Sequence, residues 1–201
     1  MGHRVFIAIN FPKGIKEKLY QAKNEYSDLP CKWTRKDNLH LTLLFLGNPN
    51  DEEVLETCKV VREIGEKHNP FALKLNQIAF GPPKKMPPRM VWANGIPSKE
   101  LTMLKNDIEN SLYNGTDARY IATRHEKAQK GLNEENHQFS PHITLARIKE
   151  WQLRQMEIEE IPQIDKEINL KIIVSSIEVM ESELKKEGPE YTILESCPLS
   201  N

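Results

Sequence analysis

The strongest constraint on the fold is a four-residue pattern that occurs twice in the chain. His40-Leu41-Thr42-Leu43 and His142-Ile143-Thr144-Leu145 share the order His, aliphatic residue, Thr, Leu, and their first residues are 102 positions apart. Each copy lies in an apolar run, residues 39–46 and 142–146, which is too short and too continuous for a surface helix. We therefore expect two buried strands, each carrying one copy of the pattern.

Strand geometry determines how these side chains are presented. Residues two apart on a strand share a face, so the His and the Thr of each copy project together while the aliphatic residues anchor the opposite face. A single His in an apolar strand is most simply a hydrogen-bonded core residue. Two matched His-Thr pairs instead suit in-line displacement at phosphorus, with one imidazole as base, the other as acid, and the hydroxyls as donors. Such a site needs no metal, and we expect none.

The rest of the chain alternates between strand and helix patterns. Helical spacing of apolar residues predicts helices over residues 15–26, 54–64, 101–112 and 150–161. Short apolar runs predict further strands over residues 5–9, 71–75, 90–93, 168–180 and 191–194. No linker rich in Gly, Ser or Pro divides the chain, so we expect a single α+β domain over residues 1–201, with antiparallel pairing.

Composition excludes several classes of protein. The 201 residues carry 28 Lys and Arg against 29 Asp and Glu, so no overall positive field attracts long nucleic acid, although a local basic patch remains compatible with an RNA substrate. The three cysteines are too few and too scattered for a disulfide framework or a zinc site. No apolar run approaches the roughly 18 residues of a membrane span, and no signal peptide is evident, so we expect a cytoplasmic protein.

The repeated pattern and its flanks resemble the 2H phosphoesterases, and within them the RNA 2′,3′-cyclic phosphodiesterases, also called 2′-5′ RNA ligases. The resemblance covers essentially the whole chain. It rests on an opening strand at residues 4–9, the first motif at residues 38–47, Pro-Arg-x-x-Trp at residues 88–92, the second motif at residues 140–147, and a closing hairpin at residues 181–191.

This resemblance implies a bilobal α+β fold. Two pseudo-symmetric antiparallel sheets, flanked by helices, would face each other across a central cleft, with two intertwined lobes that each contribute one motif strand. It also implies hydrolysis of RNA 2′,3′-cyclic phosphate ends to 2′-phosphomonoesters by a monomeric enzyme without metal or cofactor. His40 would be the proton donor and His142 the proton acceptor, while Thr42 and Thr144 would stabilise the phosphate.

Arg147 is a candidate for substrate binding, because it matches the family's Arg after the second motif. It lies five positions from His142, an odd spacing that points away from His142 on a regular strand. Either the strand ends or bulges near Ala146, or Arg147 is a surface or salt-bridge residue.

Three further candidates lie in segments that could contact RNA through cations and an aromatic ring. Arg89 lies in a basic connection, residues 82–89, whereas Tyr120 and Arg124 lie in a long segment without periodicity, residues 113–139. Phe45 and Phe139 adjoin the two motifs and could flank a base, but we expect both to pack in the core.

Two other functions remain open. The same site could belong to a non-catalytic module that binds RNA ends, or to a 2H phosphodiesterase that acts on a small cyclic nucleotide. Intact His and Thr in both motifs favour catalysis over binding alone. The resemblance also implies reversible ligation of 2′-5′ linkages, which we treat as secondary.

Overall fold

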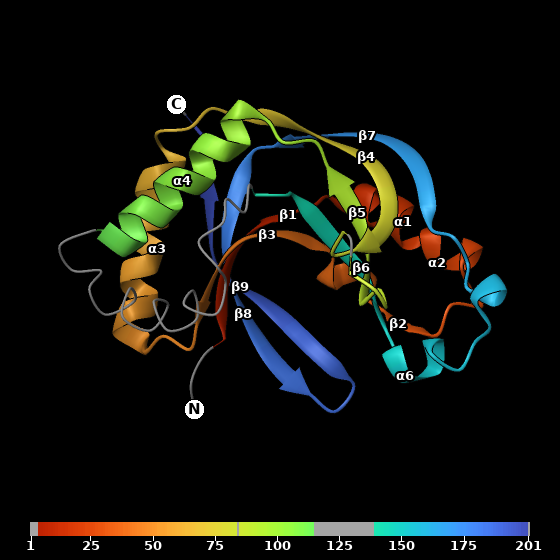
Figure 1. The fold of residues 1–201 in the computed structure, drawn as a ribbon. Coiled ribbons are helices and arrows are strands. Elements are labelled where there is room, and N and C mark those ends of the chain that lie inside the picture. The colour runs from red at the N-terminus through yellow and green to blue at the C-terminus, as the bar shows by residue number, and fades with distance from the viewer. Residues whose placement is uncertain (1–3, 84, 115–138, 201) are drawn as a thin grey trace.

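The computed structural model describes residues 4–83, 85–114 and 139–200 (Figure 1). The helices are α1 (Lys13–Tyr20), α2 (Ala22–Glu25), α3 (Asp51–Gly65), α4 (Lys99–Asn114) and α6 (Glu150–Leu153), with 3₁₀ turns η1 (Lys36–Asn38) and η2 (Ile158–Glu160). The strands are β1 (Val5–Asn10), β2 (Cys31–Trp33), β3 (His40–Gly47), β4 (Phe71–Gly81), β5 (Met90–Gly95), β6 (His142–Ile148), β7 (Asp165–Val174), β8 (Ser176–Lys185) and β9 (Gly188–Pro198). This arrangement confirms the expected α+β class.

The strands form two antiparallel half-sheets that join into one nine-stranded sheet. Its order is β7-β4-β5-β6-β3-β1-β8-β9, with β2 paired to β6 off this path. The first half, β3-β1-β8-β9, therefore combines strands from the beginning of the sequence with two strands that follow β7. The second half, β7-β4-β5-β6, is built from the residues between them. The chain thus leaves the first half and returns to complete it.

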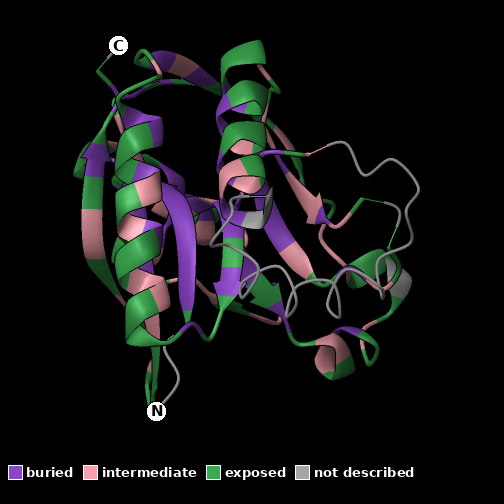
Figure 2. Cartoon of the chain, turned by 90° about the vertical axis from the view of Figure 1, so that its left-hand side faces the viewer, coloured by how far each residue is buried: buried purple, intermediate pink, exposed green. Residues whose placement is uncertain are grey.

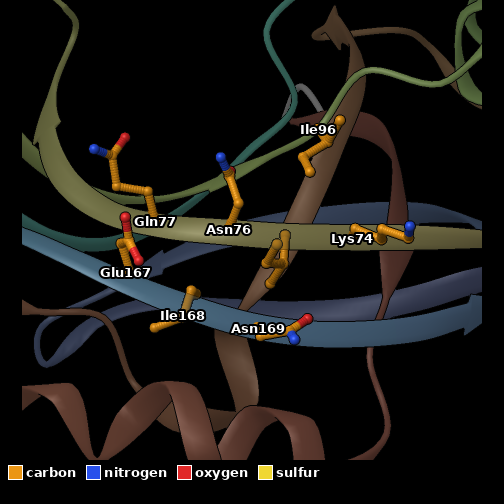
Figure 3. Close-up of a pocket in the computed structure, with 8 residues that line it drawn as sticks. Lys74, Asn76, Gln77, Ile96, Glu167, Ile168 and Asn169 are labelled. Atoms are coloured by element: carbon orange, nitrogen blue, oxygen red, sulfur yellow. The ribbon is translucent and has the colours of Figure 1, made fainter.

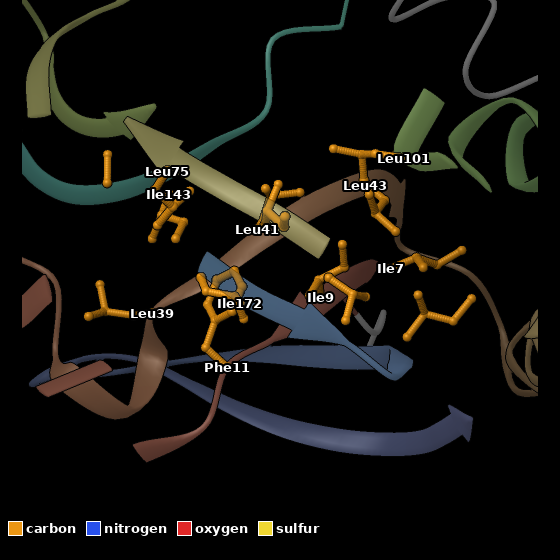
Figure 4. Packing of buried hydrophobic residues seen from close by; sticks show 14 of the residues in the cluster. Ile7, Ile9, Phe11, Leu39, Leu41, Leu43, Leu75, Leu101, Ile143 and Ile172 are labelled. Carbon is orange, nitrogen blue, oxygen red and sulfur yellow. The ribbon is translucent and has the colours of Figure 1, made fainter. Parts of the chain in front are cut away.

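The two halves meet where the two motif strands pair. β3 and β6 share a single antiparallel register pair, Leu41 with Ile143, and both residues have no exposed surface. Figure 4 shows these two side chains among others of the apolar core, including Leu75 from β4 and Leu101 from α4. Aliphatic residues of both motifs thus pack into one common core, which explains why the motif strands are buried on one face.

The helices cover the sheet with their apolar stripes. α3 packs against β8, β9 and α4, while α4 also contacts β3 and β4. In Figure 2 the ribbons of both helices alternate between buried residues, coloured purple, and exposed residues, coloured green. Asn50 caps α3: its side chain accepts from the backbone N–H of Glu53, and the Glu53 carboxylate accepts from the backbone N–H of Asn50. Among the described residues, no helix is both long and apolar enough to cross a membrane.

Several predicted boundaries were wrong. The predicted strand at residues 168–180 is two strands, β7 and β8, which separate at Ser175 and belong to opposite halves of the sheet. The predicted helix at residues 150–161 ends at Leu153, and the one at residues 15–26 is divided into α1 and α2. β2 was not predicted, because three residues are too few to show a period.

Truncating Leu41 to Ala should destabilise the protein strongly. The change removes buried methyl groups at the contact between the two half-sheets, and such a cavity costs about 2–5 kcal/mol. Urea unfolding of the variant measures this loss. Leu55→Ala is the matched control: Leu55 is 64% exposed on α3, so its truncation should change the free energy of unfolding by less than about 0.5 kcal/mol. Equal losses in both variants would contradict the proposed role of the contact.

Candidate functional site

His40 opens β3, and its ring is held by the backbone two residues earlier. Its Nδ1 lies 2.8 Å from the carbonyl oxygen of Asn38, and a carbonyl can only accept, so Nδ1 carries the hydrogen. In the neutral ring Nε2 is then the acceptor, and it lies 3.0 Å from Oγ1 of Thr42, whose hydroxyl donates to it. The predicted pairing of His and Thr on one strand face is thus present in the first motif.

His142 opens β6 with the same backbone hydrogen bond. Its Nδ1 lies 2.8 Å from the carbonyl oxygen of Ser140, again two residues earlier. Both imidazoles therefore have the same tautomer, with Nε2 unprotonated in the neutral ring. Oγ1 of Thr34, the residue after β2, donates a 2.9 Å hydrogen bond to the carbonyl oxygen of Thr144. This hydrogen bond links β6 to the end of β2.

The one register pair between the motif strands predicts how the two rings are arranged. Continuing the antiparallel register from Leu41 and Ile143 places His40 across from Thr144 and His142 across from Thr42. Both histidines then lie on the face opposite the core, as diagonal neighbours. Diagonal neighbours on adjacent antiparallel strands lie about 7–8 Å apart. This spacing suits two groups that act on opposite sides of one phosphate.

Both motif strands contain a β-bulge at the same position. In β3, Ala8 pairs with Thr42 and Ile7 with Leu44, so Leu43 is an extra residue. In β6, Trp92 pairs with Thr144 and Val91 with Ala146, so Leu145 is the extra residue. The burial pattern of the first seven residues is identical in the two strands, with two consecutive buried residues at the bulge. The residue five positions after each histidine consequently returns to the histidine's face.

The bulge changes the direction expected for Arg147 on a regular strand. Arg147 is exposed beyond the bulge, close to Tyr191 of β9: burial raises the pKa of that phenol, and the positive charge of Arg147 opposes the shift. The ring of Tyr191 in turn contacts His40, with centroids 5.2 Å apart. Arg147 therefore lies on the histidine face. Its counterpart in β3 is Phe45, which is 64% exposed, so the prediction that Phe45 packs in the core is wrong. Phe139 does pack against the core.

Aromatic rings pack against both histidines, and none of these rings was predicted as part of the site. Phe6 of β1 lies against His40, with ring centroids 4.9 Å apart. Trp92 of β5 stacks on His142 at 3.8 Å and an interplanar angle of 20°. A Cβ on Gly81 would lie 2.2 Å from the Trp92 indole, so glycine is required beneath it. Trp92 and Tyr191 lie in segments on which the family resemblance rests. That resemblance was the one feature of the sequence that could have indicated their place in the site.

Burial keeps both imidazoles neutral. It lowers the pKa of His40 to about 4; the hydrogen bond to Asn38 opposes this shift, while the charge of Lys16 adds to it. Burial also lowers the pKa of His142, and the hydrogen bond to Ser140 opposes that shift. Each ring therefore presents an unprotonated Nε2 near neutral pH.

Of the three remaining candidates, the structure describes only Arg89. The guanidinium of Arg89 forms an ion pair with Glu150 of α6, with Nε and Oε1 3.1 Å apart, so its role in substrate binding stays a prediction. Tyr120 and Arg124 lie outside the described residues, as does Lys84 of the 82–89 connection. A separate hollow over β4 and β7 is lined by residues 74–77, Ile96 and residues 167–169, and neither histidine lines it (Figure 3).

A metal site would need several ligating side chains close together. Within the described part of the chain, no three His, Cys, Asp or Glu side chains cluster closely enough to hold a metal ion. The polar groups that do converge are imidazoles, hydroxyls and one guanidinium, which suit proton transfer and anion binding.

Several known proteins are similar to this chain over most of its length. The model of the family described as LigT like phosphoesterase matches residues 9–92 and 116–191. An RNA 2′,3′-cyclic phosphodiesterase of Aquifex aeolicus (strain VF5) is 28% identical, over 96% of this chain and 95% of its own. A protein of the same name from Aeropyrum pernix is 30% identical, over 84% of this chain and 86% of its own.

Solved structures share the fold. A crystal structure of a Thermus thermophilus protein superposes with a TM-score of 0.78 at 26% identity, covering 98% of this chain and 97% of its own. Escherichia coli LigT, crystallised with phosphate, superposes with a TM-score of 0.69 at 24% identity, over 100% of this chain and 99% of its own. The bilobal antiparallel architecture is therefore that of these proteins.

The buried, neutral state of His40 should make stability depend on pH. An unfolded His binds a proton near pH 6.5, whereas His40 in the folded protein does so near pH 4, so acidification through this window favours unfolding. The shift corresponds to about 3 kcal/mol lost between pH 7 and pH 4. Urea unfolding at pH 7, 5.5 and 4 measures it, with His40→Asn as reference because that variant cannot titrate. Parallel pH dependences of wild type and variant would contradict the prediction.

Proposed function

The chain belongs to the LigT like phosphoesterase family, and on that premise we propose that it hydrolyses RNA 2′,3′-cyclic phosphate ends to 2′-phosphomonoesters. The observation that carries this proposal is the matched pair of imidazoles. Both have Nδ1 bound to a backbone carbonyl and Nε2 on the histidine face, one from each half of the sheet. A cyclic phosphate between them would have one proton-transfer group on each side.

The proposed reaction is an in-line displacement by water. Nε2 of His142 accepts a proton from water as the water oxygen bonds to phosphorus. The bond from phosphorus to O3′ breaks, and Nε2 of His40, protonated at the start, gives its proton to O3′. The products are a 2′-phosphomonoester and a free 3′-hydroxyl, and exchange with solvent restores the two proton states. Attack by the 5′-hydroxyl of a second RNA in place of water, with O3′ again leaving, would form a 2′-5′ linkage.

Substrate binding accounts for the protonation of His40 in this scheme. The cyclic phosphate carries a negative charge, which stabilises a nearby imidazolium and raises the pKa of His40 from its low value in the free protein. The Thr42 hydroxyl, which otherwise donates to Nε2 of His40, would turn to a non-bridging phosphate oxygen. Thr144 would do the same from β6, so both hydroxyls stabilise charge that grows in the transition state.

Recognition of an RNA end needs few groups beyond these. Arg147 would pair with phosphate oxygens through two parallel N–H groups, and the exposed ring of Phe45 offers a surface on which a base can stack. Both half-sites come from one chain, so a monomer suffices. Binding of a single terminal phosphate is also compatible with the net charge of −1, because such a protein has no overall positive charge to attract long nucleic acid.

Replacing either histidine should abolish hydrolysis. We expect His40→Ala and His142→Ala each to lower kcat at least about 10²-fold on an oligoribonucleotide with a 2′,3′-cyclic phosphate, because each loses one proton-transfer group. His68→Ala is the control, since His68 pairs with Asp107 and is not part of this site. Near-wild-type turnover by either of the first two variants would refute the mechanism.

The same assay separates the alternatives. Identification of the product isomer tests bond cleavage: a 3′-phosphate would overturn the assignment of O3′ as leaving group. Binding of the cyclic end without turnover would favour a non-catalytic module, and turnover of 2′,3′-cyclic AMP alone would favour a small-nucleotide enzyme. We expect EDTA to leave the rate unchanged, and strong inhibition by EDTA would indicate a metal requirement.

Arg147 should contribute to binding of the phosphate. Loss of a charge-assisted hydrogen bond costs about 1.5–3 kcal/mol, so Arg147→Ala should lower kcat/KM about 10- to 100-fold. Arg147→Lys should recover only part of this, because Lys lacks the planar fork. Arg154→Ala is the control, since Arg154 is exposed and pairs with Glu150. Unchanged kcat/KM in Arg147→Ala would place that residue outside the binding site.

A further inference from the structure

Two charged residues are buried close to His40. Lys16 of α1 is only 7% exposed and Glu178 of β8 only 4%, although Lys and Glu are seldom buried unless they are paired. Neither side chain has a role in the proposed reaction. Burying two charges is costly, so their presence requires an explanation.

Lys16 holds the backbone that orients the ring. Its Nζ donates to the carbonyl oxygen of Asp37 at 2.5 Å. The next residue, Asn38, supplies the carbonyl that accepts from Nδ1 of His40. The ammonium therefore fixes η1, the turn whose last carbonyl sets the direction and tautomer of the imidazole.

Glu178 holds the strand on the other side of His40. Its Oε2 accepts from the backbone N–H of Asn10 at 3.0 Å, and Asn10 is the register partner of His40 on β1. Its Oε1 accepts from the hydroxyls of Ser176 at 2.6 Å and Ser196 at 3.4 Å. The carboxylate thus ties β1 to β8 and β9 at the position beside the ring.

We propose that Lys16 and Glu178 form a positioning pair for His40, which fixes the backbone on both sides of its ring and sets the charge next to it. This inference rests on the proposed function only for its kinetic consequences. It assigns the two residues to the catalytic step without contact with substrate, and it explains why two charges are kept in a buried position.

The second half-site has a neutral counterpart. The register partner of His142 is Asn94 of β5, whose Nδ2 lies 3.4 Å from Oε1 of Gln77. Gln77 in turn donates through Nε2 to Oδ1 of Asp165 at 2.6 Å. Both histidines thus have an asparagine as register partner, but the groups next to that asparagine differ: a buried carboxylate beside Asn10 and an amide beside Asn94. The positioning pair therefore makes two otherwise matched histidines unequal.

The charges around His40 come from several elements. Lys16 lies on α1, Asp37 on η1, Glu178 on β8 and Tyr191 on β9, while His142 and Arg147 lie on the facing strand β6. Burial lowers the pKa of Lys16, but Asp37 and Glu178 oppose that shift. Burial raises the pKa of Glu178, and its hydrogen bonds and Lys16 oppose that shift. Lys16 is the neighbouring charge that lowers the pKa of His40, so its removal has a definite sign.

The test compares Lys16→Met with Lys18→Met. Lys18 is exposed on the same helix, so its replacement controls for a change of net charge. In Lys16→Met we expect the pKa of His40, followed by NMR of its ring protons, to rise, and the lower apparent pKa of the kcat/KM profile to rise with it. We expect kcat to fall about tenfold, because the ring loses its exact placement. Lys18→Met should change none of these quantities.

Glu178→Gln provides the opposite charge change. The amide still accepts from Asn10 but removes the negative charge that balances Lys16, so the pKa of His40 should stay or fall. A rise of the His40 pKa in both variants would indicate a loosened site and would overturn the electrostatic role of the pair. An unchanged His40 pKa in Lys16→Met would overturn it as well. The NMR titration needs no turnover. An inactive wild type with the expected shifts would therefore refute the proposed function while supporting the positioning pair.

Discussion

The contact between Leu41 and Ile143 is the constraint on which the rest of the structure depends. It joins two half-sheets that share no other register pair between β3 and β6, and it buries the aliphatic side of both motifs. Because strand side chains alternate, burial of these residues directs both histidines to the opposite face. A hydrophobic contact thus places two polar groups at a defined separation, which catalysis at one phosphorus atom requires.

Local hydrogen bonds then orient the two histidine rings. The carbonyl two residues before each histidine selects the same tautomer, so Nε2 is the unprotonated atom of both neutral rings. Aromatic rings limit the movement of each imidazole and remove water from it, which lowers the pKa of both. The two half-sites are alike in these contacts and differ in the residues around them, where one has buried opposite charges and the other has amides. Two matched rings with unequal surroundings suit the proposed reaction, in which one ring gives a proton and the other takes one.

Apolar spacing predicted the elements that have a strong period and missed those determined by long-range contacts. Both motif strands, the helices α3 and α4 and the α+β class follow from that spacing, and the repeated pattern singled out His40, Thr42, His142 and Thr144 as candidates. The bulges at Leu43 and Leu145 leave no distinct local signal, so the direction of Arg147 and the exposure of Phe45 could not be derived from spacing. Lys16 and Glu178 resemble surface residues in the sequence, because burial of a charge depends on partners that lie far away in the chain.

The return of the chain to its first half-sheet has a consequence for biosynthesis. β8 lies beside β1, and Tyr191 on β9 contacts His40, so the half-site of the first histidine includes strands that follow the entire second half. A nascent chain that has already made His40, β1 and β3 still lacks Glu178 and the Tyr191 ring. The order of translation thus delays assembly of the contacts around His40 until β9 has left the ribosome.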